Sequence, residues 1–376
     1  MIERGRSVIG PGAGAFCYDH LLSLAGGFLV RIEPDRIASL LAVLLAAIAS
    51  APARGQDDGI VSFSPPYPTF GEIERLDPAI DALIPPAAEL KLLAEGFDWA
   101  EGPVFVPDGD YLLFSDIPPN SIYRWSEPDG ISLFMRPSGY DGERTDLREP
   151  GSNGLALDRD GSLLLAEHGN RRIAKLVSLA EPNGGKTTIA ARHEGRRLNS
   201  PNDLVVASNG NIYFTDPPYG LAGQANDPEK ELDFQGIYLV RRPGNEVVLL
   251  ATQTRPNGLG LSPDERTLYV ANTDFNEPYI YAYEIEDDGT LGARRVFFDA
   301  GTLASLGRRG APDGMTVDAR GNLWATGPGG VLIIDPDGRH LGSILTGLAT
   351  ANCTFGRDGS TLFITADSRL GRLDLE

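Results

Sequence analysis

Short runs of alternating apolar and polar residues recur along the chain from about residue 95 to its end. Each run opens at a polar residue, continues through an apolar segment, turns at a cluster of Asp, Asn and Gly, and finishes in a second apolar segment. Alternation with period two, broken by residues that tolerate positive φ, is typical of β-hairpins. Six copies are present, and they read EGPVFVPDGDYLLFSD, NGLALDRDGSLLLAEH, NDLVVASNGNIYFTDP, NGLGLSPDERTLYVAN, DGMTVDARGNLWATGP and NCTFGRDGSTLFITAD.

The spacing of these copies predicts the fold. Successive copies begin 39 to 56 residues apart, close to the length of one four-stranded propeller blade. Further strand-like runs lie between them, such as GIYLVRR at 236–242 and VVLLATQ at 247–253, and these would form the outer strands of a blade. After residue 100 no 12-residue segment has the periodicity of an amphipathic helix. We therefore predict an all-β protein, a six-bladed β-propeller of four-stranded blades.

The last copy indicates how the ring closes. Only 24 residues follow Asn352, enough for about three strands. The apolar stretch AELKLLAEGF at 88–97 can supply the fourth strand, and this pairing would remove an exposed sheet edge. We therefore expect one propeller domain over residues 58–376.

The N-terminal residues 1–57 have a different character. An unbroken apolar run at 37–48 follows Arg31 and Arg36 and precedes small residues at 49–53, which is the layout of a secretory signal peptide. We expect a mature N-terminus near residue 54 and a periplasmic or secreted protein. A single amphipathic or buried helix is the alternative, and the protein would be cytoplasmic if the segment were not used. Removal of the segment would leave Cys353 as the sole cysteine, with no internal disulfide.

Charge and composition narrow the choice of partners. The formal net charge of −19 argues against binding to nucleic-acid phosphates. Four His and two Cys are too few for a Cys/His metal scaffold, whereas 45 Gly and 28 Pro fit a chain with many turns. We expect a small-molecule ligand and no stable membrane insertion of the mature protein. The oligomeric state is open.

The polar residue that opens each copy occupies the same position in its blade. Because the innermost strand of every blade lines the central channel, these six side chains should meet around the axis. Carboxylates brought together raise one another's pKa unless a cation neutralises them. Two carboxylates and several amide oxygens suit a hard cation, so a metal on the axis would be Ca²⁺ before Zn²⁺. A single Asn-Gly or Asp-Gly is more often a simple turn signal, but six equivalent oxygen donors favour the site. The six are Glu101, Asn153, Asn202, Asn257, Asp313 and Asn352.

At these residues the chain resembles the SMP-30/gluconolactonase family, and most closely its bacterial gluconolactonase branch. The resemblance runs from about residue 90 to the C-terminus and rests on AEGPVF, SNGLALDRDG, AEHGNRRI, LNSPNDLVV, YFTDPPYGL, RPNGLGLSPD and PDGMTVDARGNLW. It implies a six-bladed propeller with one catalytic divalent cation, Ca²⁺ in the first place, with Mg²⁺, Zn²⁺ or Mn²⁺ as alternatives. The family's metal ligands fall on Glu101, Asn202, Asn257 and Asp313. An Arg that precedes the ND motif in animal members is replaced by Ser200, which puts the animal-type sugar contacts in doubt.

The function implied is hydrolysis of a sugar lactone. The metal would polarise the ester carbonyl while Asp313, besides binding the metal, would help water to attack. His168 would assist proton transfer or hold a sugar hydroxyl, with a strand-end histidine bonded to the backbone as an equal alternative. Asn153 would contact the substrate, and Tyr219 would either wall the pocket or fill the core. The pair Arg171–Arg172 fits a solvated surface pair better than a site for a substrate carboxylate.

Two other functions fit the same residues. The first is a metal-dependent hydrolase of other esters or of organophosphates, because one Lewis acid polarises C=O and P=O alike. The second is a non-enzymatic propeller that binds a ligand in a Ca²⁺-dependent way, since the fold alone never determines the function. The absence of a G-x-S-x-G elbow, an HExxH motif and a phosphate-binding Gly-rich loop weakens serine-hydrolase, zinc-protease and nucleotide-binding alternatives.

Overall fold

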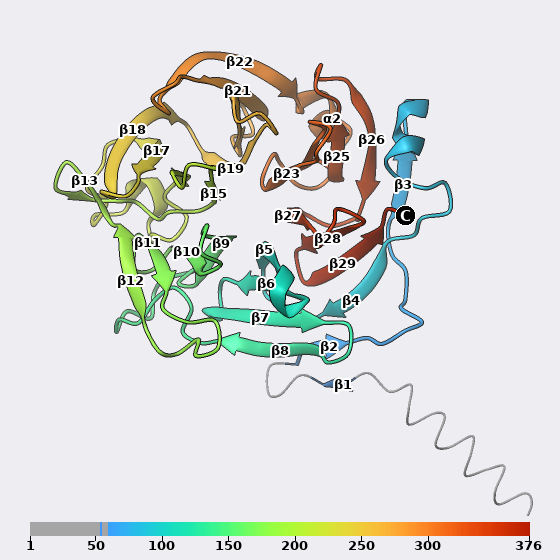
Figure 1. Ribbon diagram of the computed structural model, residues 1–376, viewed down its shortest axis with the longest axis horizontal. Helices are drawn as coiled ribbons and strands as arrows, with labels where there is room; N and C mark the ends of the chain where they lie inside the picture. The colour runs from blue at the N-terminus through green and yellow to red at the C-terminus, as the bar shows by residue number, and fades with distance from the viewer. Residues whose placement is uncertain (1–52, 55–58) are drawn as a thin grey trace, which may run out of the picture. The chain divides into compact units, whose positions relative to one another are not determined.

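The computed structural model describes residues 53–54 and 59–376, which form a ring of β-sheets around a central axis (Figure 1). The signal-like run at 37–48 and Cys17 lie outside the described residues. The signal peptide and the periplasmic location therefore stay predictions. Within the described part of the chain, no helix is long and apolar enough to cross a membrane.

Six antiparallel blades, each built on four strands, make up the ring, which confirms the predicted propeller. From the axis outward, blade 1 contains β5 (Ala100–Val106), β6 (Tyr111–Asp116), β7 (Ser121–Ser126) and β8 (Gly130–Met135). Blade 2 contains β9 (Ser152–Leu157), β10 (Leu163–Glu167), β11 (Arg172–Leu176) and β12 (Lys186–Ala190). Blade 3 contains β15 (Leu204–Val206), β16 (Ile212–Asp216), β17 (Gln235–Arg241) and β18 (Glu246–Gln253). The last two of these are the outer strands predicted at 236–242 and 247–253.

The other three blades have the same order. Blade 4 contains β19 (Pro256–Leu261), β20 (Thr267–Asn272), β21 (Tyr279–Ile285) and β22 (Leu291–Asp299). Blade 5 contains β23 (Met315–Val317), β24 (Leu323–Gly327), β25 (Gly330–Ile334) and β26 (His340–Leu345). Blade 6 contains β27 (Thr350–Phe355), β28 (Thr361–Ala366), β29 (Arg369–Asp374) and β4 (Lys91–Glu95).

The inner strands of a blade are more buried than the strand at its rim. All five residues of β10 are buried because both faces of this strand pack against neighbouring sheets, whereas most of the rim strand β22 is exposed. Hairpin turns join the strands where the Asp/Asn/Gly clusters predicted them. Gly161 has φ of 80°, a conformation that glycine adopts without strain, and its N–H donates to the Asp158 carbonyl at 2.9 Å.

The ring closes through an N-terminal strand, as predicted. β4 pairs with β29, so residues from both ends of the described chain share blade 6. The sequence did not indicate three further pairings. β3 (Glu72–Arg75) adds a fifth strand to blade 5, and β1 (Ala53–Arg54) and β2 (Val61–Ser62) extend blade 6. These additions cover edges that would otherwise be free to pair with other chains, and β1 lies before residue 58, where the domain was predicted to begin.

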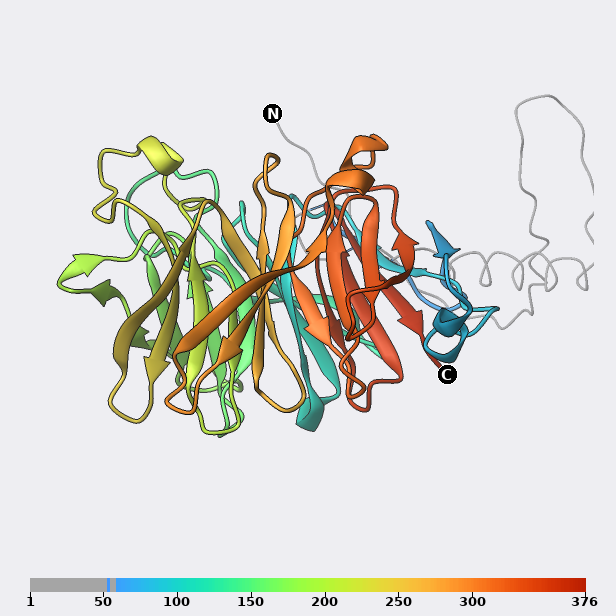
Figure 2. The same cartoon turned by 90° about the horizontal axis from the view of Figure 1, so that it is seen from above.

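The two faces of the ring differ (Figure 2). The innermost strands begin on the face that carries η3 (Gln224–Asn226) and the short helix α2 (Gly301–Ser305), and we call it the mouth face. The long connections 136–151 and 217–234 also leave their strands on this face. The opposite face carries η2 (Pro107–Gly109), which follows the end of β5. The remaining short elements are η1 (Pro78–Ala82), β13 (Arg192–His193) and β14 (Arg196–Arg197).

Candidate functional site

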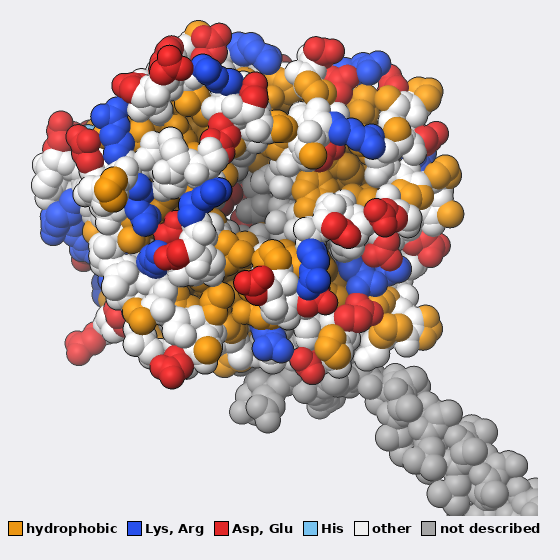
Figure 3. Space-filling model, viewed as in Figure 1, with side chains coloured by type: hydrophobic (Ala, Val, Ile, Leu, Met, Phe, Trp, Pro, Cys, Tyr) orange, Lys and Arg blue, Asp and Glu red, His pale blue; other side chains and the backbone are white. Residues whose placement is uncertain are grey.

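The six polar openings occupy the same level around the axis. Glu101, Asn153, Asn257 and Asn352 stand near the start of their innermost strands, and Asn202 and Asp313 precede theirs by two residues. Five of the six are buried, with exposed fractions of 6% or less, and Asp313 is partly buried. Towards the face opposite the mouth face, the channel widens into a cavity of about 440 Å³ that is lined by all six innermost strands. Figure 3 shows a hollow at the centre of the ring.

Glycines that follow these openings lie where neighbouring innermost strands approach each other closely. Gly102 has φ of 51°, and a Cβ there would lie 2.0 Å from the Asn153 carbonyl oxygen of the next blade. A Cβ on Gly314 would lie 1.9 Å from Cγ of Asn352. Only glycine allows neighbouring innermost strands to approach this closely at the axis.

Four carboxyl groups gather at the mouth end of the channel, two more than the sequence indicated. Burial, together with the negative charges of Asp203 and Glu149, raises the pKa of Glu101 to about 8. Burial also raises the pKa of Asp313 well above its ordinary value, and Glu101, Asp203 and Glu149 add to the rise. Carboxylates this close cannot all be charged unless a cation joins them.

The oxygen atoms at this point fit a hard cation. Oδ1 of Asp313 and Oδ1 of Asn153 are buried and accept no hydrogen bond. Asn257 Nδ2 donates to Thr273 Oγ1 at 2.8 Å. This bond orients the amide and uses its nitrogen, so the amide oxygen is left for another partner. Within the described residues no group of three or more His, Cys, Asp or Glu side chains is arranged to hold a metal. The predicted ligand set has a different composition, two carboxylates and two amides.

Asp203 is a site residue that the sequence analysis missed. It directly follows Asn202, and its pKa is raised to about 6 by burial. Asn352 Nδ2 lies 3.5 Å from its Oδ2, and Asn352 Oδ1 accepts from the Cys353 N–H at 2.8 Å. Asn352 therefore joins Asp203 below the mouth, and the Asn-Asp pair in the LNSPNDLVV motif was the signal that could have identified this residue.

Glu149 was also missed, and it accompanies His168. His168 is fully buried, and its Nδ1 lies 3.5 Å from Glu149 Oε2. Burial lowers the pKa of His168 to about 3, so its imidazole is neutral at pH 7. Burial raises the pKa of Glu149 to about 7. A carboxyl that titrates near neutrality is better suited to proton transfer than an imidazole held neutral.

Tyr219, for which the sequence left a place in the pocket wall or in the core, lies beside Asp313. Burial raises the pKa of Tyr219 to about 12, and the charge of Asp313 contributes. Its hydroxyl is buried, and the guanidinium carbon of Arg255 lies 5.9 Å from the centre of its ring. Ser200, in place of the animal-type Arg, is fully buried, and its Oγ donates to the Pro217 carbonyl at 2.6 Å and accepts from the Gly220 N–H at 3.0 Å. Ser200 therefore supports the loop that carries Tyr219.

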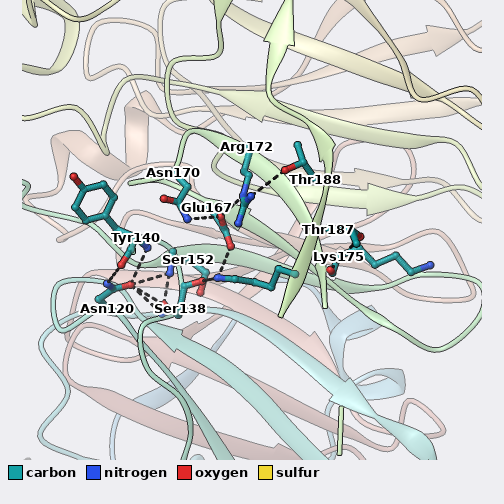
Figure 4. Close-up of polar contacts among 12 residues, drawn as sticks. Asn120, Ser138, Tyr140, Ser152, Glu167, Asn170, Arg172, Lys175, Thr187 and Thr188 are labelled. Atoms are coloured by element: carbon teal, nitrogen blue, oxygen red, sulfur yellow. Dashed lines mark hydrogen bonds and ion pairs between the residues drawn. The ribbon is translucent and has the colours of Figure 1, made fainter. Parts of the chain in front are cut away.

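The expectation that Arg171 and Arg172 form a solvated surface pair is wrong. Arg171 is 3% exposed. Arg172 Nε donates to Glu167 Oε2 at 2.6 Å, and Figure 4 shows these two side chains with Asn170, whose Nδ2 donates to the same oxygen at 2.9 Å. Glu167 is fully buried, and Lys186 Nζ lies 2.5 Å from its Oε1. The same Nζ donates to the Ser138 carbonyl at 2.7 Å, so this network links the turn after His168 to the connection that carries Glu149.

Known proteins share this fold and these motifs. Residues 99–368 match the family model described as the SMP-30/Gluconolactonase/LRE-like region. The chain is 39% identical over 316 residues to a gluconolactonase of Zymomonas mobilis, an alignment that covers 81% of this chain and 86% of that protein. It is 28% identical to a pentonolactonase of Haloferax volcanii, over 70% of this chain and 80% of that protein. The structure of a gluconolactonase from Xanthomonas campestris superimposes with a TM-score of 0.71 at 32% identity, over 82% of this chain and 97% of the other.

Proposed function

Because the chain belongs to the SMP-30/Gluconolactonase/LRE-like family, we propose that it is a lactone hydrolase that uses a divalent cation to open a sugar lactone. Its lactonase relatives support the reaction class. One structural observation supports the use of a cation. Buried carboxyl and amide oxygens from several blades converge on the axis, and some of them accept no hydrogen bond. The substrate class is an aldonolactone, since the relatives include enzymes named for gluconolactone and pentonolactone.

In this proposal Glu101, Asn202, Asn257 and Asp313 hold the cation. Two carboxylates and two amides leave places for substrate and water oxygens within the six to eight that Ca²⁺ accepts. Held by these four side chains, a cation would supply positive charge to the carbonyl oxygen of the lactone as negative charge develops there.

The side chains around the mouth have separate roles in the proposed reaction. Asp313 orients the attacking water and takes its proton on Oδ1, which has no other partner. Asn153, buried on the adjacent blade, holds a sugar hydroxyl through its free amide oxygen. Tyr219, whose hydroxyl is buried next to Asp313, closes that side of the pocket against water. His168 remains neutral and positions Glu149.

A lactone panel tests the reaction class. We expect protein loaded with Ca²⁺ to release protons from glucono-1,5-lactone at a rate well above spontaneous hydrolysis, with pentonolactones and simple alkyl esters as comparison substrates. Turnover of alkyl esters or organophosphates without turnover of any sugar lactone would replace the lactonase by another hydrolase on the same site. Tight cation binding without any turnover would favour a binding propeller.

Glu149 has its own test. We expect Glu149→Gln to lower kcat about a hundredfold, the lower end of what a positioned acid or base contributes. The variant should also lose a pH dependence centred near 7, where the pKa of Glu149 lies. Glu143→Gln makes the same change in the same connection at an exposed position and serves as the control. Unchanged kcat and an unchanged pH profile in Glu149→Gln would reduce Glu149 to part of the pocket wall.

A further inference from the structure

A second cavity lies on the mouth face between blades 2 and 3. Its volume is about 130 Å³. The charged side chains that line it are Arg144, Arg171, Arg197 and Glu229. They come from the connection 136–151, the turn after β10, β14 and the connection 217–234. The lining is thus richer in cations than in anions, although the protein as a whole carries a net charge of −19.

Arg171 is a buried cation with unused hydrogen-bonding capacity. Its Nε donates to the Leu198 carbonyl at 2.7 Å and its Nη1 to the Glu229 carbonyl at 3.0 Å. Its Nη2 is buried and has no hydrogen-bond partner. Burial lowers the pKa of Arg171, and the positive charge of Arg197 lowers it further, although Glu231, Asp216 and Glu229 oppose this. Two guanidinium groups therefore stand close together here.

Arg197 has no counter-ion of its own. Only its backbone N–H bonds a carboxylate, Glu231 Oε2 at 2.6 Å, and within the described residues its guanidinium makes no hydrogen bond or ion pair. Arg144 is different, because Asp146 at 2.8 Å and Glu229 at 3.0 Å already neutralise it. The cavity thus brings together two arginines with donor capacity to spare: Nη2 of Arg171 is buried without a partner, and the guanidinium of Arg197 makes no ion pair within the described residues. The forked guanidinium group is suited to phosphate and carboxylate oxygens.

The cavity is adjacent to the candidate active site. Gly169, which follows His168, and Gly220, which follows Tyr219, both line it. A Cβ on Gly220 would lie 2.6 Å from the Cβ of His168, so the two loops are in contact. We propose that this cavity binds a small oxyanion, a phosphate or carboxylate group, between the guanidinium groups of Arg171 and Arg197.

The oxyanion has two possible sources. It is either a free ion or the phosphoryl group of a phosphorylated sugar lactone, and this second source rests on the proposed lactonase function. Because Gly169 and Gly220 connect this cavity to His168 and Tyr219, the sugar ring of a phosphorylated substrate would extend towards the mouth of the channel.

Calorimetric titration with inorganic phosphate tests the site without any need for turnover. We expect binding to the wild type, at least about tenfold weaker binding to Arg197→Met, and unchanged binding to Arg266→Met. Arg266 is an exposed arginine on blade 4, so its replacement controls for the loss of one positive charge. Arg171→Met should abolish binding, but it also removes two hydrogen bonds within the protein. Arg197→Met is therefore the primary variant, since the Arg197 side chain bonds nothing among the described residues.

Kinetics then identify the source. If glucono-1,5-lactone 6-phosphate is preferred over the unsubstituted lactone, and Arg197→Met loses only that preference, the oxyanion belongs to the substrate. If phosphate binds while both lactones are hydrolysed alike, the site takes a free ion. If inorganic phosphate does not bind the wild type, and both lactones react equally in wild type and Arg197→Met, the cavity holds only water and the proposal is overturned.

Discussion

Replacement of Asp313 by Asn or Ala should lower the rate of lactone hydrolysis at least about a thousandfold while the β-sheet content stays unchanged. The substitution removes a proposed cation ligand and a proton acceptor together, and each contribution alone is worth about a hundredfold or more. The fold should persist because Asp313 is only partly buried and its Oδ1 accepts no hydrogen bond, while Asn257, which bonds the Asp313 side chain, keeps its bond to Thr273. Proton release measures the rate, and circular dichroism measures the fold.

Asp337→Asn is the matched control for this variant. Asp337 belongs to the same blade, in the turn between β25 and β26, and its side chain is exposed. We expect it to keep the wild-type rate. Full activity in Asp313→Ala would remove Asp313 from the mechanism and with it the assignment of the axial site as the reaction centre.

Removal of the cation should also lower the rate of lactone hydrolysis strongly. A protein stripped with a chelator should retain less than about 1% of its activity, and Ca²⁺ should restore it more effectively than Mg²⁺, Zn²⁺ or Mn²⁺. The melting temperature should fall on stripping, since Glu101 and Asp313 then lie close together without a neutralising charge. Unimpaired hydrolysis by fully stripped protein would contradict the proposed role of the cation.

The pH dependence of cation binding follows from the same carboxyl groups. In the cation-free protein the pKa of Glu101 is raised from 4.5 to about 8, so the folded protein holds a proton that the unfolded chain loses. The contribution of Glu101 to the free energy of unfolding of the cation-free form should therefore be most favourable below about pH 4.5 and should decrease as the pH rises towards 8. The cation competes with this proton, so its affinity should increase from pH 6 to pH 8.

Calorimetric titration with Ca²⁺ at several pH values measures this dependence. Glu101→Gln, which has no proton to lose, should bind Ca²⁺ weakly and with a smaller dependence on pH. An affinity that does not change between pH 6 and pH 8 would show that Glu101 is not a ligand.

The repeat pattern and the axial residues could be read from the sequence alone because their causes are local. Alternating apolar residues define strands, and Asp, Asn and Gly clusters define turns, over distances of a few residues. Six similar repeats must stack around an axis to bury their faces, so the opening residue of each repeat reaches the channel wherever the blade lies. For this reason the repeats alone place Glu101, Asn153 and Asp313 at the axis, and the shortness of the last repeat places β4 in the last blade.

Burial and pairing between distant segments were decided by the tertiary structure. The pKa of Glu149 is raised because the folded chain buries its carboxyl beside His168, and nothing in its local sequence indicates that packing. Arg171 looks like a surface residue in the sequence, but the connection 217–234 covers it. Gly314 looks like part of a turn, but the neighbouring strand brings Asn352 against it. In each case the deciding contact joins residues far apart in the chain, and only the closed ring brings them within reach.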